Sequence, residues 1–371
     1  MVMSDSSGWQ FWIDRGGTFT DVVARAPSGK ILTRKLLSEN AKLYADAAVH
    51  AIEQLTAQYA HEEAPVLDCV KMGTTIGTNA LLERKGEPTV LITNEGFADA
   101  LRIGYQNRPD IFALNIVLPD MLYECVVPVR ERTAFDGTVL QELDVAAAEI
   151  SMASVYEQGY RCCAILLLHA YKYPEAEKQL AELARVIGFE QISCSHEVSP
   201  LIKFVSRGDT TLCDAYLSPL LSRYIAGLAK GLPKTRLMFM QSNGGLTAAE
   251  HFSGKDSLLS GPAGGVIGAV KTAASLGMNE IITFDMGGTS TDVSHFSAEL
   301  APNSETPLAR VRLRSPILDI HTVAAGGGSI LHFDGARLRV GPDSAGAAPG
   351  PLCYRNGGPL TISDANLMLG K

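Results

Sequence analysis

The sequence predicts an α/β protein whose two related halves face one cleft. A ten-residue segment near the start, 13–22, and another near the end, 284–293, share Asp, Gly-Gly-Thr and Thr-Asp-Val at seven equivalent positions. Each segment follows an apolar, β-rich run and leads back into β-type sequence, which is the pattern of a hairpin with a tight turn. Strand and helix patterns alternate between the two copies. Unrelated turns rarely match over this length, so we interpret the copies as equivalent starts of two α/β domains.

The repeated hairpin has residues that suit an anion and a hydrated cation. Glycine pairs allow positive φ angles and let the backbone approach an anion closely. Threonine hydroxyls and successive backbone N–H groups donate to phosphate oxygens. An aspartate at the end of the first strand can hold a hydrated Mg²⁺ together with phosphate. The predicted phosphate-binding residues are Gly16, Gly17, Thr18, Thr20, Gly287, Gly288 and Thr289, and the predicted metal-binding residues are Asp14 and Asp285.

Length and composition indicate a globular protein of more than one domain. The 371 residues suggest two or three domains, and we predict domains over 1–205 and 206–371. A net charge of −8 argues against nucleic acid or an anionic membrane surface as the main partner. The seven dispersed cysteines fit free thiols, and neither a signal peptide nor a membrane-spanning run is visible. A cytoplasmic location is therefore expected.

The first predicted domain begins with an antiparallel meander of three strands, 11–14, 19–24 and 31–37. A helix is predicted over 42–58 and a strand over 66–72. The strand leads into Gly73-Thr74-Thr75, which opens a helix. Thr74 and Thr75 are predicted either to bind phosphate at the helix N-terminus or to cap the helix. Further strands are predicted at 89–93, 163–168 and 191–194, and further helices at 145–156 and 174–186.

The segment 96–137 is irregular, with many polar, proline and aromatic residues. We predict a long functional loop or insertion there, which helps to select the substrate.

The second predicted domain opens with a helix over 209–228 and a strand over 236–240. Ser260-Gly261-Pro262-Ala263-Gly264-Gly265 starts a helix that runs to about 276, and its glycines either serve phosphate or allow close packing. The second hairpin follows directly. A strand-like segment, 319–329, ends in Gly326, Gly327 and Gly328, which either contact a nucleotide or substrate or form a turn at the strand end.

These motifs, taken in order, resemble the hydantoinase A/5-oxoprolinase family, which also includes the ATP-using subunits of acetone and acetophenone carboxylases. The resemblance runs from Ile13 to the last residues. It implies the fold of the actin, Hsp70 and sugar-kinase ATPases, in which a ribonuclease H-like domain is duplicated and the paired hairpins bind phosphate. Family members continue beyond the segment 363–367, so we expect a fragment, a truncated gene product or a naturally shortened relative, and the adenine-side glycine motif expected of the fold would lie further on. The matching segments are 14–21, 73–83, 260–265, 285–292, 321–329 and 341–346.

The resemblance implies ATP-dependent opening of a cyclic amide or imide, such as 5-oxoproline or a hydantoin. A lactam is a poor electrophile, so transfer of the γ-phosphoryl group to the amide oxygen would give an activated imidate phosphate that water can attack. Asp14 and Asp285 would be the catalytic residues and would contact Mg²⁺ or its waters. No Ser-His-Asp or zinc pattern supplies a hydrolytic nucleophile. A companion hydantoinase B-type subunit or domain is therefore expected to complete the ring opening.

Several hypotheses stay open from the sequence. The chain could activate a carbonyl or bicarbonate oxygen, as in the carboxylases, or act as a non-catalytic nucleotide switch, or be an inactive remnant. Asp319 and His321 lie two residues apart on a predicted strand and either hold a metal or form a hydrogen-bonded pair. No residue identifies the lactam, imide or carbonyl substrate, or the oligomeric state.

Overall fold

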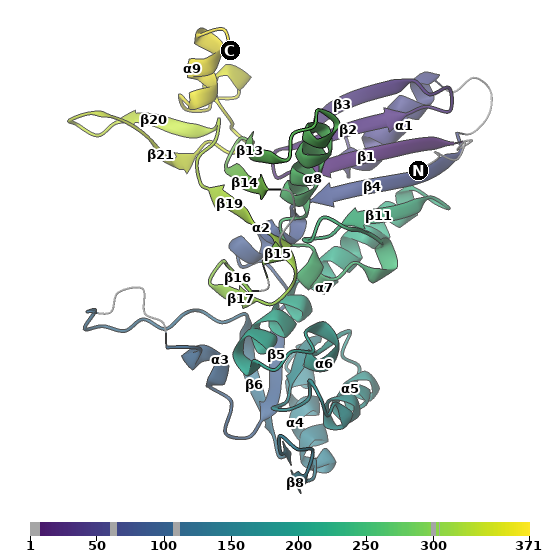
Figure 1. Ribbon diagram of the computed structural model, residues 1–371, viewed down its shortest axis with the longest axis vertical. Helices are drawn as coiled ribbons and strands as arrows, with labels where there is room; N and C mark the ends of the chain where they lie inside the picture. The colour runs from purple at the N-terminus through teal and green to yellow at the C-terminus, as the bar shows by residue number, and fades with distance from the viewer. Residues whose placement is uncertain (1–7, 60–64, 107–111, 298–301, 304) are drawn as a thin grey trace.

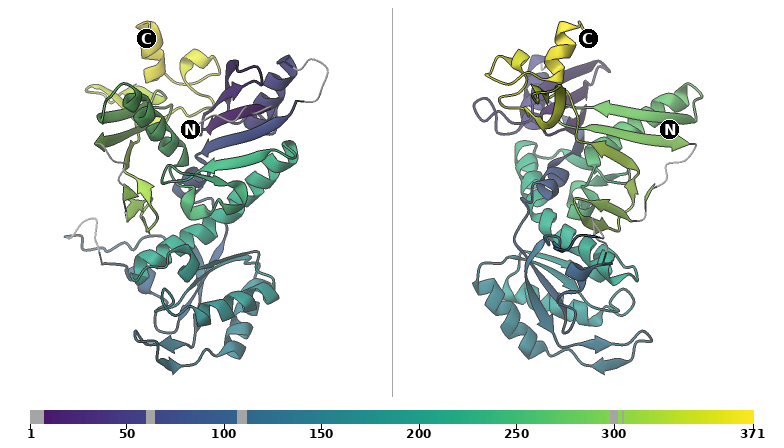
Figure 2. Two further views of the ribbon diagram at one scale, coloured as in Figure 1. Left: turned by 45° about the vertical axis from the view of Figure 1, so that its right-hand side comes forward. Right: turned by 90° about the vertical axis from the view of Figure 1, so that its left-hand side faces the viewer.

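The computed structural model describes residues 8–59, 65–106, 112–297, 302–303 and 305–371, and it has a mixed α/β fold. Two sheets that contain the repeated hairpins stand side by side at one end of the long axis, and a third sheet lies at the other end (Figure 1). Figure 2 shows the same separation from two other directions. Among the described helices, none is both long and apolar enough to cross a membrane.

The first repeated hairpin belongs to a six-stranded sheet. Its first three strands form the predicted antiparallel meander, β4 pairs with β1 in parallel, and β11 pairs with β4 in parallel. Leu55 of α1 (Ala47–Tyr59) and Leu228 of α7 (Phe204–Gly231) pack into the core of this sheet. In the order β12-β11-β4-β1-β2-β3, the strands are Leu246–Ala248, Arg236–Met240, Leu67–Thr74, Trp9–Arg15, Phe19–Arg25 and Ile31–Leu37.

The helix α1 spans Ala47–Tyr59 and begins later than the predicted residue 42. The reason is local hydrogen bonding, because Asp46 Oδ1 accepts from the backbone N–H groups of Ala48 and Val49 at 2.9 and 3.0 Å. A short side-chain acceptor at this position satisfies the free N–H groups of the first helical turn and fixes where the helix starts.

The six-stranded sheet draws strands from both sides of the predicted boundary at residue 205. The chain leaves this sheet after α2 (Ile76–Leu82) and returns through α7 (Phe204–Gly231), which leads into β11. The six-stranded sheet therefore does not coincide with the predicted domain 1–205, and the predicted boundary at residue 205 lies inside α7. Pairing between β4 and β11 joins strands that are far apart in the chain, and the local sequence pattern does not reveal such pairing.

The segment between α2 and α7 forms a separate four-stranded parallel sheet, which α4 and α5 cover. The region 96–137, predicted to be irregular, contains β6, whose Val127 and Val129 are buried. That prediction is corrected here, since proline and polar residues around a short buried strand hid its pattern. The elements are β5 Thr89–Asn94, β6 Tyr123–Val129, β9 Cys162–Leu166, β10 Gln191–Cys194, α4 Val145–Glu157 and α5 Glu175–Ile187, with the short α3 Ala100–Ile103, α6 Ser195–Val198, β7 Arg132–Thr133 and β8 Val139–Gln141.

The second repeated hairpin forms a three-stranded antiparallel sheet, β13-β14-β19. The helix α8 lies between this sheet and the six-stranded sheet (Figure 1), and its Val266 and Val270 pack with Phe296. The bounds are α8 Ser260–Ser275, β13 Glu280–Met286, β14 Thr291–Ser297 and β19 Ile320–Val323.

Short elements complete the second half. An arm that contains β17 reaches α7, where Arg312 Nε lies 2.5 Å from Asp209 Oδ2. Arg312 Nη2 also donates to the carbonyl oxygen of Leu101 at 3.0 Å, so the arm joins α7 to α3. The remaining strands are β15 Pro302–Asn303, β16 Thr306–Leu308, β17 Val311–Leu313, β18 Ile317–Leu318, β20 Ser329–Phe333 and β21 Leu338–Ser344, and α9 Ile362–Met368 ends the chain.

Candidate active site

The two repeated segments form the predicted hairpins, and their strand registers are equivalent. Asp14 in β1 is directly opposite Asp21 in β2, and Asp285 in β13 is directly opposite Asp292 in β14. Side chains that face each other across a pair of strands point to the same side of a sheet. Each hairpin therefore presents two neighbouring carboxylates beside its glycine turn.

Both turns are closed by the same kind of hydrogen bond. The backbone N–H of Gly16 donates to the carbonyl oxygen of Phe19 at 3.0 Å, and that of Gly287 donates to Ser290 at 2.8 Å. A Cβ atom at Gly16 would lie 3.0 Å from that Phe19 oxygen, a tight contact that the turn could accept only by a small shift. The glycines bring exposed backbone to the surface of the site.

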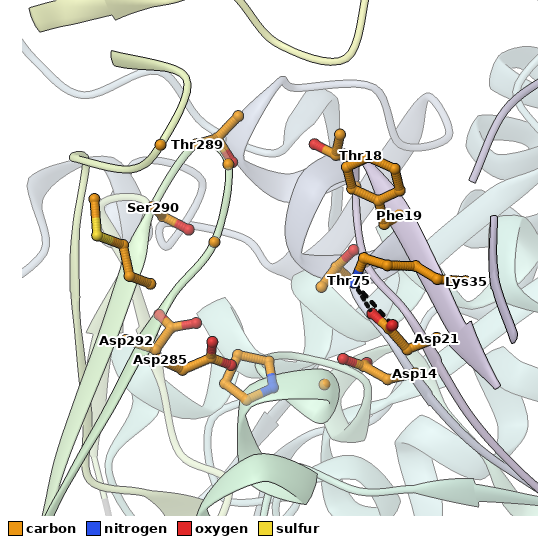
Figure 3. A pocket seen from close by; sticks show the side chains of 18 of the residues that line it. Asp14, Thr18, Phe19, Asp21, Lys35, Thr75, Asp285, Thr289, Ser290 and Asp292 are labelled. Atoms are coloured by element: carbon orange, nitrogen blue, oxygen red, sulfur yellow. Dashed lines mark hydrogen bonds and ion pairs between the residues drawn. The ribbon is translucent and has the colours of Figure 1, made fainter. Parts of the chain in front are cut away.

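The two hairpins line one cavity of about 500 Å³. Figure 3 shows Asp14 and Asp21 on one side and Asp285 and Asp292 on the other, so that the four carboxylates face one another. The structure thus brings together ten of the sequence-predicted site residues: Asp14, Gly16, Gly17, Thr18, Thr75, Asp285, Gly287, Gly288, Thr289 and Gly327.

The first turn of α8 separates the two predicted metal-binding aspartates. A Cβ atom at Gly261 would lie 3.0 Å from Asp14 Oδ1, and one at Gly265 would lie 4.0 Å from Asp285 Oδ2. Each glycine therefore lies next to one carboxylate. The two glycines are four residues apart, so they share one face of the helix. Of the two predictions for this glycine motif, close packing is the one that these distances support.

Two carboxylates of the cavity, those of Asp14 and Asp292, have raised pKa values. Although Asp14 opens to the cavity, the surrounding protein atoms and then Asp21 and Asp285 raise its pKa to about 6. Burial, followed by the charge of Asp285, raises the pKa of Asp292, and Thr322, which donates to it at 2.6 Å, opposes the shift. Like charges close together favour the protonated form or a bound cation. Such a site gains stability from a divalent ion.

Lys35 lines the same cavity and donates to both oxygens of Asp21, at 2.8 and 2.6 Å. The pairing compensates one of the four carboxylates. The remaining charge stays negative, so a free polyphosphate would be repelled, and a polyphosphate that carries a divalent cation would be accepted.

No group of three or more potential ligands is placed to hold a metal on its own within the part of the chain that the structure describes. Two carboxylates with Gly-Thr turns nearby fit Mg²⁺, which keeps several waters and takes its other ligands from phosphate oxygens. Asp319 and His321 lie outside this cavity at the start of β19, where Ser294 Oγ donates to the carbonyl oxygen of Asp319. The hypothesis of a metal site there has no third ligand among the described residues.

Two predicted phosphate-binding threonines do not reach the cavity. Thr20 is fully buried and its hydroxyl lies 3.0 Å from Ser38 Oγ, which in turn donates to the carbonyl oxygen of Gly16. Thr74 is also fully buried, and its Oγ1 accepts from the backbone N–H of Ile76 at 3.2 Å, whereas the N-cap position of α2 is Thr75. Both residues support the walls of the cavity from behind. This placement does not support direct phosphate binding by Thr20 or Thr74.

The glycine loop 326–328 packs on the turn of the second hairpin. Gly327 N donates to Gly287 O at 2.9 Å, and Gly328 N donates to Gly288 O at 2.6 Å. A Cβ atom at Gly326 would stand 2.7 Å from the carbonyl carbon and oxygen of Gly288. Gly327 alone of the three lines the cavity. The loop therefore fixes the position of the second turn.

Sequence reasoning missed several residues of the cavity. Asp21 and Asp292 belong to the repeated Thr-Asp-Val. Side chains alternate between the two faces of a strand, so the hairpin register would have placed these residues on the same face as Asp14 and Asp285. Lys35 is the register partner of Asp21 in the predicted meander, so the same alternation would have placed it there. Three further residues had no comparable signal, because they approach from a distant part of the chain: Tyr354, Ser363 and Asn366.

The model of the hydantoinase/oxoprolinase N-terminal region matches residues 10–188, and the hydantoinase/oxoprolinase model matches residues 207–371. 5-Oxoprolinase 1 of Arabidopsis thaliana is 42% identical over an alignment of 396 positions, which covers 97% of this chain and 31% of the plant protein. The chain thus spans less than a third of that relative's length.

Two solved structures share the fold. The ATP-dependent caprolactamase from Pseudomonas jessenii aligns with a TM-score of 0.78 and 31% identity, over 97% of this chain and 55% of that chain. The nucleotide-free structure of an acetone carboxylase, described as an enzyme of ATP-dependent acetone carboxylation, aligns with the same TM-score, 0.78, and 26% identity, over 97% of this chain and 54% of that chain.

The motifs with which this chain resembles a known family therefore lie within the segments that the family models match. These matches, 10–188 and 207–371, together take in both hairpins, α8 and the glycine loop. The chain belongs to the hydantoinase/oxoprolinase family.

Proposed function

We propose that this chain is the ATP-using part of a 5-oxoprolinase-type enzyme, which phosphorylates the amide oxygen of a cyclic amide to activate ring opening. The observation that supports it best is the convergence of two equivalent hairpins, each with an Asp pair and a Gly-Gly-Thr turn, on one acidic cavity. The 42% identity to a 5-oxoprolinase and the likeness to an ATP-dependent caprolactamase favour a lactam as substrate.

In this proposal the two hairpins hold opposite sides of the ATP polyphosphate. Backbone N–H groups and hydroxyls of the turns at Gly16–Thr18 and Gly287–Thr289 donate to phosphate oxygens. Asp14 and Asp285 would hold Mg²⁺ or its waters, and a bound ion would supply positive charge beside the phosphate oxygens. Thr75, at the start of α2, adds a hydroxyl from the floor of the cavity.

We further propose that the two halves are duplicated actin-like domains. The antiparallel strands β1-β2-β3 correspond in order and direction to β13-β14-β19, and the equivalent aspartates occupy equivalent register positions. In that arrangement, closure of one half on the other would bring the two turns onto the same nucleotide, as phosphoryl transfer by positioning requires.

Phosphorylation creates a leaving group but does not open the ring. Transfer of the γ-phosphoryl group to the amide oxygen forms an O–P bond, breaks the bond between the γ-phosphorus and its bridging oxygen, and releases ADP. Water then adds to the activated carbon, the C–N bond breaks with protonation of the ring nitrogen to give an acyl phosphate, and a second water hydrolyses this acyl phosphate to a carboxylate and inorganic phosphate. We propose that a companion hydantoinase B-type subunit or domain supplies the groups for this second step, as the name of a related protein, caprolactamase subunit alpha, suggests a multi-subunit enzyme.

Titration of the chain with Mg·ATP by isothermal calorimetry tests this proposal. We expect micromolar binding, and a loss of at least about 30-fold in Asp14→Ala and in Asp285→Ala, because each variant removes one carboxylate that holds the cation, an interaction of roughly 2 kcal/mol. Glu280→Gln is the matched control, since Glu280 is exposed on the same strand as Asp285 but outside the cavity. Wild-type affinity in both alanine variants would contradict the proposal.

The close contact between Gly261 and Asp14 leads to a second prediction. Gly261→Ala should weaken Mg·ATP binding by about 10-fold, because the new Cβ atom would lie 3.0 Å from Asp14 Oδ1 and push this carboxylate from its position. Gly268→Ala in the same helix is the control, since a Cβ atom there meets no atom within 4 Å. Equal affinity of the two variants would show that Gly261 has no part in positioning Asp14.

A carboxylase function is the second candidate, because the chain aligns with an acetone carboxylase at a TM-score of 0.78. In that reaction the same phosphoryl transfer would activate a carbonyl or bicarbonate oxygen. ATP hydrolysis that rises with bicarbonate and not with a lactam would favour this candidate. A nucleotide switch without catalysis would bind ATP, but its hydrolysis would respond to neither compound.

A further inference from the structure

A second cavity adjoins the acidic one. Its volume is about 490 Å³, and it shares Asp14, Asp21 and Gly261 with the first cavity. The shared residues stand at the junction, so a ligand in the second cavity would meet the proposed phosphoryl group beside Asp14. A phosphoryl acceptor needs this placement, because transfer requires the two reacting atoms in contact.

The strand register fixes which side chains line the second cavity. Trp12 in β1 is paired with Val23 in β2 and with Lys71 in β4. The next row toward the turn, two residues on, consists of Asp21, Asp14 and Gly73. Alternate residues of a strand point to the same face and lie about 7 Å apart. The cavity therefore has a row of carboxylates at one end and a row with Trp12 and Lys71 at the other.

The rest of the wall is apolar and closely packed. Met240 and Leu246 line it, together with Gly264 of α8, where an added Cβ atom would lie 3.7 Å from Met240 Cε. The indole of Trp12 and the thioether of Met240 are suitable contacts for a small ring.

Lys71 gives the second cavity a positive charge with no carboxylate partner among the described residues, whereas the charge of Lys35 in the first cavity is paired with Asp21. Its Nζ lies 5.0 Å from the ring centroid of Trp12, an orientation that a cation–π contact stabilises. No carboxylate pairs with Lys71 in the described segments, whereas Lys35 binds both oxygens of Asp21. The charge of Lys71 is thus available to a ligand.

We propose that the second cavity binds a small lactam that carries a carboxylate, with Lys71 as the carboxylate-binding residue. This inference deepens the proposed function and rests on it. Asp14 and Asp21 repel a ligand carboxylate from the junction, and Lys71 attracts it to the opposite end. The ring then contacts Trp12, and its amide oxygen points to the junction where phosphoryl transfer would occur. 5-Oxoproline, a five-membered lactam with one carboxylate, has this distribution of charge.

The test compares two ligands that differ only in the carboxylate. L-5-Oxoproline and 2-pyrrolidinone are titrated into the wild-type chain and into Lys71→Met, with ligand-observed NMR as the readout. We expect 5-oxoproline to bind the wild type at least about 10-fold more tightly than 2-pyrrolidinone, and Lys71→Met to abolish that difference without changing the affinity for 2-pyrrolidinone. Trp12→Ala should lower the affinity for both ligands, because it removes the apolar wall and leaves the charge of Lys71 in place.

Lys30→Met is the matched control, because Lys30 Nζ also lies over an aromatic ring, 4.8 Å from the centroid of Tyr59, away from both cavities. Affinity for 5-oxoproline in Lys71→Met equal to that of the wild type would overturn the inference, and so would equal affinity of the wild type for the two ligands. Mg·ATP is titrated separately. Loss of nucleotide binding with intact lactam selectivity would contradict the proposed function and leave the lactam site standing.

Discussion

Replacing Gly326 by alanine should weaken Mg·ATP binding by more than about 100-fold and lower the stability of the second half of the protein. The added Cβ atom would lie 2.7 Å from the carbonyl carbon and oxygen of Gly288 and 2.8 Å from the oxygen of Gly287. These neighbours are backbone atoms, which cannot rotate away as a side chain can. The turn would have to move, and with it the N–H groups proposed to bind phosphate. Overpacking of this kind costs about 1–3 kcal/mol.

Calorimetry with Mg·ATP and thermal unfolding measure the two effects separately. Gly227→Ala is the matched control, since Gly227 is a helical glycine of α7 at which a Cβ atom meets nothing within 4 Å. If Gly326→Ala kept both the affinity and the unfolding temperature of the control, the glycine loop would not position the second turn. A loss of affinity without a loss of stability would point to a direct role of the loop in binding.

The second large effect concerns Glu177, in the four-stranded half of the molecule. We expect Glu177→Leu to destabilise the protein by about 4 kcal/mol. This side chain is fully buried, and its oxygens accept from Leu167 N at 2.9 Å, Ser195 Oγ at 2.6 Å, His196 N at 3.0 Å and His196 Nδ1 at 2.6 Å. Leucine would leave these donors buried without an acceptor, at about 1–3 kcal/mol for each unsatisfied group.

The fully buried Arg207 of α7 belongs to the same hydrogen-bond network. Replacing Glu177 of α5 should therefore also destabilise α7. Arg207 Nη1 donates to Ser195 Oγ at 3.1 Å, and Nη2 donates to the carbonyl oxygens of Leu167 and Leu168 at 2.8 and 2.9 Å. Burial lowers the pKa of Arg207, and the charge of Glu177 opposes that shift. Loss of Glu177 would leave this cation without its buried counter-charge.

Urea unfolding gives the change in the free energy of unfolding. Glu175→Leu on the same helix is the control, because Glu175 is exposed and its replacement should change stability by less than about 0.5 kcal/mol. A destabilisation by Glu177→Leu of less than about 1 kcal/mol would show that water or other groups satisfy the four donors.

Local pattern was sufficient to predict the hairpins and most helices of this protein. Gly-Gly-Thr turns flanked by β-rich residues gave β1–β2 and β13–β14, since a tight turn and the alternation around it depend only on neighbours in the chain. The helices α4, α5 and α7 followed from apolar spacing for the same reason. The short strand β6 was missed because so few residues contain no resolvable period.

The direction in which an individual side chain points depends on both the local pattern and the tertiary structure. Thr18 lines the cavity and Thr20 lies behind it, although both belong to the same repeated motif. Alternation along β2 would have separated Thr20 from Asp21 once the register with β1 was fixed. The predicted list treated the motif as a unit, and it therefore included Thr20 and omitted Asp21.

The sequence by itself determined that two equivalent acidic hairpins exist and which residues form their turns, because turn chemistry is local. Only the tertiary structure decided that they meet in one cavity, that α8 stands between Asp14 and Asp285, and that β11 returns to the first sheet. It also decided that Lys71 and Trp12 form a charged and apolar row beside Asp14. These placements depend on contacts between residues far apart in the chain. Burial of the whole core selects such contacts, and no short sequence pattern encodes them.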